Sequence, residues 1–232
     1  FHFDLEDDFI QLRLVYDDDR YDRDYMVQIV EHLDQLFSVV LNQPDLELSQ
    51  VDMLSEFHRN KLLYDFNDTR VGYPQNKTMH QLFEEQVERT PDHPAVVFEN
   101  RQLTYRELNQ KSNQLARLLQ AKGVQADQFV GIMAERSLEM IIGLFGILKA
   151  GGAYVPIDPE YPADRIHYIL EDSKVAWLLH QSHIQKPEHF AGTCVILDSE
   201  INHYEDHLNL VDGAISSDLA YMIYTSGTTG HP

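Results

Sequence analysis

The residues with the clearest chemical potential lie at the end of the sequence, in the run Tyr224–Pro232. This run follows an apolar stretch, 219–224, that we expect to be a buried strand, and it contains mainly small hydroxylated residues and glycines. Glycine permits positive φ angles and close approach of the backbone to a ligand. Hydroxyl groups and successive backbone N–H groups donate to phosphate oxygens. The pattern indicates a phosphate-binding loop, and its candidate residues are Thr225, Ser226, Gly227, Thr228, Thr229 and Gly230.

The same run fits a polar surface turn after a strand, and the residues alone leave both interpretations open. A Walker A loop is excluded because no Gly-Lys pair followed by Ser or Thr closes it. Ser226 lacks the Gly-x-Ser-x-Gly context of a hydrolase nucleophile, and no base can be assigned to it. A phosphate-binding role therefore fits this run better than nucleophilic catalysis.

Two histidine pairs, His180 with His183 and His203 with His207, have spacings that could chelate a metal. No third ligand stands at a fixed spacing from either pair, so we expect solvated or core histidines and predict no metal site. The acidic run 17–19 lacks the central glycine and distant glutamate of an EF-hand loop, and we expect a solvated turn there.

Composition excludes several classes of partner. The 232 residues, 43% of them hydrophobic, can form one large or two modest globular units. The formal net charge of -20 argues against nucleic acid and anionic membranes as partners. It does not argue against ATP, because charges beyond about 8 Å are largely screened at physiological salt. The longest apolar run, 140–148, is shorter than the ~20 residues of a membrane span. The single cysteine, Cys194, fits a reducing compartment, and we expect a cytoplasmic protein.

The elements that must position the loop alternate between helix and strand from residue 78 onward. Capping boxes at Thr78 with Gln81 and at Thr104 with Glu107 predict two helix starts, and Ser137 caps a third helix. A further helix follows Pro162. The predicted strands are 95–98, 102–104, 129–133, 153–155, 175–179 and 194–197.

Strands separated by helices of this length predict parallel pairing with right-handed crossovers. The expected fold class is therefore α/β, with a mostly parallel sheet flanked by helices. Ligands of such sheets bind at the carboxyl ends of the strands, and the candidate loop leaves the stretch 219–224 at that end.

The first 77 residues have a different pattern. An alternating strand is expected at 10–16, followed by an amphipathic helix whose apolar stripe includes Met26 and Phe37 and whose cap is Asp24. Residues 42–77 contain turn-forming residues without apolar periodicity. We expect a small α+β piece here, with a core separate from that of residues 78–232.

Residues 219–232 resemble, position by position, a core motif of acyl-adenylate-forming enzymes, specifically of the amino-acid adenylation domains of nonribosomal peptide synthetases. That motif reads Leu-Ala-Tyr-x-x-Tyr-Thr-Ser-Gly-(Ser/Thr)-Thr-Gly-x-Pro-Lys-Gly. Its lysine would follow Pro232, so we expect a fragment that ends inside the loop. The segments Leu103–Leu108 and Leu148–Pro159 resemble the first and second core motifs of the same domains.

The resemblance also implies a domain organisation. Residues 1–48 are similar to the C-terminal tail of a condensation domain, 49–77 to a linker, and 78–232 to the N-terminal part of an adenylation domain. The condensation signature, two adjacent histidines followed by Asp-Gly, is absent from the sequence.

The function that the resemblance implies is activation of an amino acid as aminoacyl-AMP with ATP and Mg²⁺, followed by transfer to a phosphopantetheine thiol. The implied partners are the amino-acid substrate and the carrier-protein and condensation domains of one assembly line. The loop would hold the β- and γ-phosphates as pyrophosphate leaves. Catalytic residues are expected downstream of Pro232 or upstream of Phe1, so the 232 residues alone are expected to be inactive.

Two alternatives remain open at this point. One is a stand-alone acyl- or aryl-CoA ligase of the same superfamily, although such a ligase would not carry the linker around Asn67-Asp68-Thr69. The other is a non-catalytic interaction platform with a degenerate loop.

Overall fold

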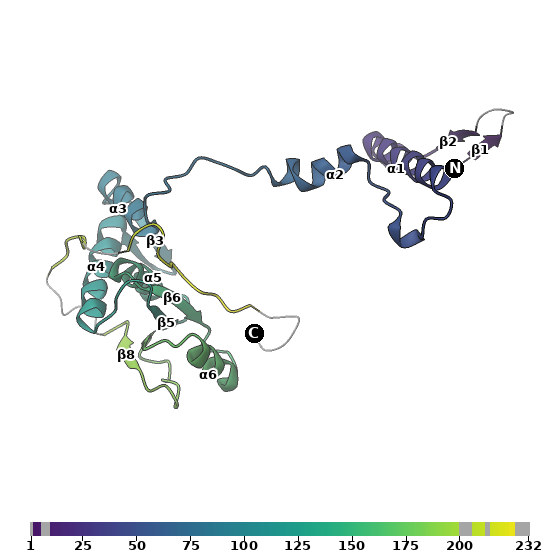
Figure 1. Ribbon diagram of the computed structural model, residues 1–232. Coiled ribbons are helices and arrows are strands. Elements are labelled where there is room, and N and C mark those ends of the chain that lie inside the picture. The colour runs from purple at the N-terminus through teal and green to yellow at the C-terminus, as the bar shows by residue number, and fades with distance from the viewer. Residues whose placement is uncertain (1, 6–9, 200–205, 212–213, 226–232) are drawn as a thin grey trace. The chain divides into compact units, whose positions relative to one another are not determined.

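The computed structural model describes residues 2–5, 10–199, 206–211 and 214–225, and Figure 1 shows the course of the chain. The chain divides into two compact units, Phe1–Tyr73 and Pro74–Pro232, each with its own secondary structure. None of the helices in the described ranges is both long enough and apolar enough to cross a membrane.

The first unit combines a β-hairpin with helices. Strand β1 (His2–Leu5) pairs antiparallel with β2 (Ile10–Arg13), which is shorter than the predicted strand 10–16. The predicted cap at Asp24 is wrong: Asp22 has extended dihedrals, and its carboxylate accepts from the Asp24 backbone N–H at 2.7 Å. Asp24 lies inside the first turn, where its charge still favours the helix dipole. The helices are α1 (Arg23–Asn42), α2 (Glu56–Leu63), and the 3-10 turns Leu48–Gln50 and Asp65–Asn67.

The second unit opens with the two predicted capping boxes, and both are confirmed. The Thr78 hydroxyl accepts from the Gln81 backbone N–H at 3.2 Å, and the Thr78 N–H donates to the Gln81 side chain at 2.9 Å. Thr104 and Glu107 exchange the same pair of bonds. They begin α3 (Met79–Arg89) and α4 (Tyr105–Ala121), with the antiparallel hairpin β3 (Pro94–Phe98) and β4 (Arg101–Thr104) between them.

A four-stranded parallel sheet follows, with strand order β6-β5-β7-β8. Its register places Gly131 level with Val155 on one side and with Leu178 on the other. The predicted α/β class with a mostly parallel sheet is confirmed. The elements are β5 (Phe129–Met133), α5 (Leu138–Ala150), β6 (Ala153–Ile157), α6 (Ala163–Asp172), β7 (Trp177–His180) and β8 (Thr193–Ile196).

Helices bury both faces of this sheet (Figure 1). On one face, Val130 and Ile132 of β5 share a core cluster with buried residues of α4 and α5. On the other face, Met133 and Leu178 share a second cluster with buried residues of α6. The alternation along each strand therefore divides the core into two layers.

Candidate functional site

The segment that leads into the candidate loop lies beside β6 at one side of the sheet. Tyr221 forms a parallel bridge with Tyr154 of β6. The Tyr154 N–H donates to the Ala220 carbonyl at 3.1 Å, and the Met222 N–H donates to the Tyr154 carbonyl at 3.0 Å. The two tyrosine rings stack, with centroids 5.5 Å apart and an interplanar angle of 24°.

The prediction of a buried strand over 219–224 is wrong in extent and in burial. The pairing is confined to the bridge at Tyr221, and Leu219, Tyr221 and Ile223 are each about half exposed. Met222 and Tyr224 pack against the second core cluster. Among the described residues this segment pairs on one side only and buries one face only, so its apolar residues alternate between core and solvent.

Two aspartates hold this segment at its ends. The Leu219 backbone N–H donates to Asp127 Oδ1 at 2.7 Å, and the Tyr224 hydroxyl donates to Asp172 Oδ2 at 2.5 Å. Burial, together with the hydrogen bond to Asp172, raises the pKa of the Tyr224 hydroxyl far above its usual range. The hydroxyl therefore remains a donor at any physiological pH.

Of the predicted loop residues, Thr225 is described by the structure and is exposed. It follows Tyr224, whose hydroxyl is bound to Asp172 at the end of α6. The other candidates lie outside the described residues: Ser226, Gly227, Thr228, Thr229 and Gly230.

Asp127 and Asp172 were missed by sequence reasoning. They lie 92 and 52 residues from their partners in the chain, and both read as solvated acidic residues at element ends. Asp127 carries a weak signal, because it has a positive φ of 63° between α4 and β5. No local pattern marks Asp172 as the partner of a tyrosine.

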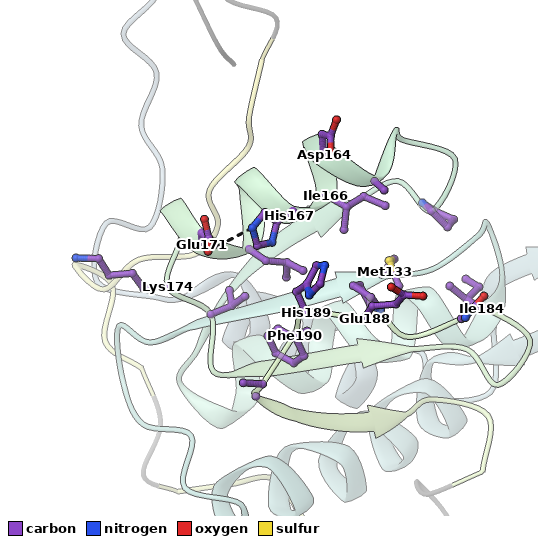
Figure 2. A pocket seen from close by; sticks show the side chains of 18 residues that line it. Met133, Asp164, Ile166, His167, Glu171, Lys174, Ile184, Glu188, His189 and Phe190 are labelled. Carbon is purple, nitrogen blue, oxygen red and sulfur yellow. Dashed lines mark ion pairs between the residues drawn. The ribbon is translucent and has the colours of Figure 1, made fainter.

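A cavity of about 740 Å³ lies beside α6, between that helix and the loop 184–192. Buried apolar residues form its floor, among them Met133, Ile166 and Phe190. Figure 2 shows His167 of α6 near His189, and the centroids of the two rings are 5.6 Å apart in a T-shaped arrangement. His167 Nε2 is 3.3 Å from Glu171 Oε1. None of the described residues that line this cavity belongs to 219–225.

A smaller cavity of about 120 Å³ lies between the start of α3 and residues 214–220. His80 lines it, and burial, followed by the charge of Lys149, lowers the pKa of His80 to about 4. Lys149 is 1% exposed and forms an ion pair with Glu84. Burial lowers the pKa of Lys149, and the Glu84 carboxylate opposes that shift.

The described histidines with metal-like spacing have different surroundings. His180 is buried, with Nδ1 2.9 Å from the Gln181 carbonyl oxygen, whereas the exposed His183 lies 3.4 Å from Glu135. His207 is exposed and His203 lies outside the described residues. In the ranges that the structure covers, no three His, Cys, Asp or Glu residues come together as a metal site.

The fold agrees with the relationships of the sequence. Residues 83–232 match the family of AMP-binding enzymes, and the chain belongs to that family. Across its whole length it is 55% identical to a mycosubtilin synthase of Bacillus subtilis, of which it covers 9%. It is 53% identical to gramicidin S synthase 2 of Brevibacillus brevis over 88% of this chain and 5% of that protein. The chain thus spans less than a tenth of the length of these relatives.

Solved structures give the same relationship. The nonribosomal peptide synthetase FmoA3 matches 85% of this chain with a TM-score of 0.71 and 30% identity, over 22% of its own chain. The N-terminal subdomain of Klebsiella oxytoca NpsA, solved with 3-hydroxybenzoyl-AMSN, matches 67% of this chain with a TM-score of 0.61 and 29% identity, over 39% of its own chain. The described unit therefore has the fold of the N-terminal part of an adenylate-forming synthetase.

Proposed function

We propose that this chain is part of a modular nonribosomal peptide synthetase that activates an amino acid as aminoacyl-AMP with ATP. In this proposal the aminoacyl group then passes to a phosphopantetheine thiol on a carrier-protein domain of the same assembly line. The observation that carries the proposal is the match of residues 83–232 to AMP-binding enzymes.

The proposed organisation places a condensation-domain tail at 1–48, a linker at 49–77 and the adenylation domain from 78 onward. The identity with the mycosubtilin synthase supports this, because it extends over the residues before 78. A stand-alone acyl- or aryl-CoA ligase is less consistent with a relationship that includes this upstream region. We place the enzyme in the cytoplasm, as the single Cys194 suggests.

In the proposed mechanism, the loop binds the ATP phosphates through residues Thr225, Ser226, Gly227, Thr228, Thr229 and Gly230. The exposed Thr225 hydroxyl and following backbone N–H groups are the kind of donors that stabilise charge on departing pyrophosphate without reorganisation. The described residues contain no carboxylate cluster suited to Mg²⁺. We propose that Mg²⁺ is held by the phosphate oxygens and by residues outside these 232.

The test is amino-acid-dependent ATP–pyrophosphate exchange by the full synthetase and its Gly227→Val variant. A β-branched residue disfavours the dihedrals that a phosphate-wrapping loop uses, so we expect exchange to fall by about tenfold or more. The control is Gly72→Val, because nothing lies within 4 Å of a Cβ at Gly72. Equal melting temperatures by circular dichroism would exclude misfolding. Unchanged exchange in Gly227→Val would make the run a structural turn.

A further inference from the structure

The hydrogen bond between Tyr224 and Asp172 connects two parts of the site that the sequence separates. Tyr224 directly precedes Thr225, the first residue of the predicted phosphate loop. Asp172 is the last residue of α6, a helix that packs on the sheet through its buried Ile166, Ile169 and Leu170. The contact therefore joins the start of the loop to a helix anchored in the core.

The orientation of the Tyr224 side chain is determined by more than this one bond. Its ring packs edge to face against the ring of Tyr168, which lies one turn before Asp172 on α6, and the ring centroids are 6.2 Å apart. The Tyr224 side chain also packs against the second core cluster. Two residues earlier, the Met222 N–H donates to the Tyr154 carbonyl of β6. The backbone is thus held by the sheet on one side, and the side chain is held by α6.

We propose that Tyr224 and Asp172 are positioning residues, whose hydrogen bond fixes the point and direction at which the phosphate loop leaves the sheet. This inference rests on the proposed adenylating function. Neither side chain needs to touch ATP. The bond reduces the number of conformations available to Thr225, so less conformational freedom is lost there when the phosphates bind.

Such a role predicts an effect on nucleotide binding rather than on the chemical step. Tyr224→Phe retains the ring and its packing but removes the donor, whereas Asp172→Ala removes the acceptor. In the full synthetase each variant should raise the KM for ATP by about fivefold, the size expected from the net contribution of one hydrogen bond. The kcat and the KM for the amino acid should change by less than about twofold.

Three further variants make the comparison specific. The double variant Tyr224→Phe/Asp172→Ala should be no worse than either single variant, because both remove the same interaction. Asp172→Asn retains an acceptor oxygen and should restore part of the ATP affinity. Glu171→Ala removes the neighbouring carboxylate of α6, which pairs with His167 rather than with Tyr224, and should leave all three constants unchanged.

Amide hydrogen exchange of the same proteins gives a readout that does not depend on activity. Exchange at residues 222–225 should accelerate in Tyr224→Phe and in Asp172→Ala, but not in Glu171→Ala. Unchanged exchange there, multiplicative effects in the double variant, or equal losses for ATP and the amino acid would overturn the inference. A wild-type synthetase without pyrophosphate exchange would instead contradict the proposed function, while the hydrogen-exchange comparison would still test the positioning contact.

Discussion

At the scale of single residues, the most unusual side chain is Lys149, which is 1% exposed within the segment that resembles the second core motif. A lysine buried without a partner would be costly, and here the Glu84 carboxylate of α3 accepts from its ammonium group. The Phe83 ring lies 5.9 Å from the same ammonium. The buried pair therefore fixes α3 against the end of α5, and its role is structural.

The histidine beside this pair should make stability depend on pH. His80 is 7% exposed, and its pKa falls from 6.5 to about 4 in the folded chain. Between these values the unfolded chain binds a proton that the folded chain excludes. Stability is thus complete above about pH 6.5 and decreases as the pH falls towards 4, by at most ~3 kcal/mol.

Urea unfolding near neutral pH and near pH 5 measures this effect. The wild-type chain should lose about 2 kcal/mol more over that interval than His80→Gln, which cannot titrate. The exposed His93→Gln serves as the matched control and should behave as the wild type. Identical pH dependence in wild type and His80→Gln would show that His80 does not contribute.

Residue types pointed to the candidate loop, but they could not identify the side chains that hold the segment leading into it. Serine, threonine and glycine in one short run indicate phosphate chemistry because each supplies a donor or a permissive backbone. The anchors Asp127 and Asp172 depend on how α4, β5 and α6 are placed in three dimensions. A contact between residues that are dozens of positions apart cannot be predicted from local spacing.

At the scale of elements, local signals were enough for most of the second unit. Capping boxes, the Ser137 cap and apolar periodicity all act within a few residues, so α3 to α6 and β5 to β8 follow the predicted order with small shifts at their ends. For the stretch 219–224 the predicted strand and its burial were wrong, because its partner β6 is remote in sequence. An apolar run predicts burial only when both of its faces are covered.

Two glycines in α5 illustrate how packing overrides helix propensity. A Cβ at Gly146 would lie 2.5 Å from Leu115 Cδ2 of α4, and one at Gly143 would lie 2.6 Å from Ile132 Cδ1 of β5. In an exposed helix, alanine would be preferred to glycine by about 1 kcal/mol. Here the close approach of α5 to α4 at Gly146, and to β5 at Gly143, requires the smaller residue.

Gly146→Val should therefore destabilise the second unit by about 1–3 kcal/mol, because the added atoms overlap the Leu115 side chain. Gly72→Val, where the side chain meets open space, should change the free energy of unfolding by less than about 0.5 kcal/mol. Chemical denaturation followed by circular dichroism measures both. A neutral Gly146→Val would mean that α4 and α5 can separate without cost.

At the scale of the whole molecule, the two units differ in how much they bury. The second unit contains both core clusters. In the described part of Phe1–Tyr73, Met26 is the single buried apolar side chain, and apolar residues of α1 and α2 are largely exposed. Because burial of apolar surface is the main favourable term in folding, most of the chain's stability resides in the second unit. Amphipathic periodicity predicted α1, but it did not show that part of its apolar stripe, such as Phe37, stays exposed.

Trypsin should therefore cut between the units before it cuts inside the second one. Residues 66–77 are exposed, and Arg70 lies in a stretch without helix or strand. Brief digestion should give a fragment beginning at Val71, identified by mass spectrometry, and Arg70→Gln should delay it. Arg106, Lys111 and Arg117 lie within α4 and should resist. Early cleavage inside 104–200 would contradict a stable second unit.

The bridge between Tyr154 and Tyr221 also has a consequence for the order of folding. Strands β5, β6, β7 and β8 are each linked to a neighbour by a short crossover or loop, whereas this bridge closes a loop of about 65 residues. Contacts of high sequence separation form late, so the sheet should assemble before the loop-bearing segment joins it. During synthesis on the ribosome, strands β5 to β8 would then pair before the segment 219–225 binds at the edge of β6.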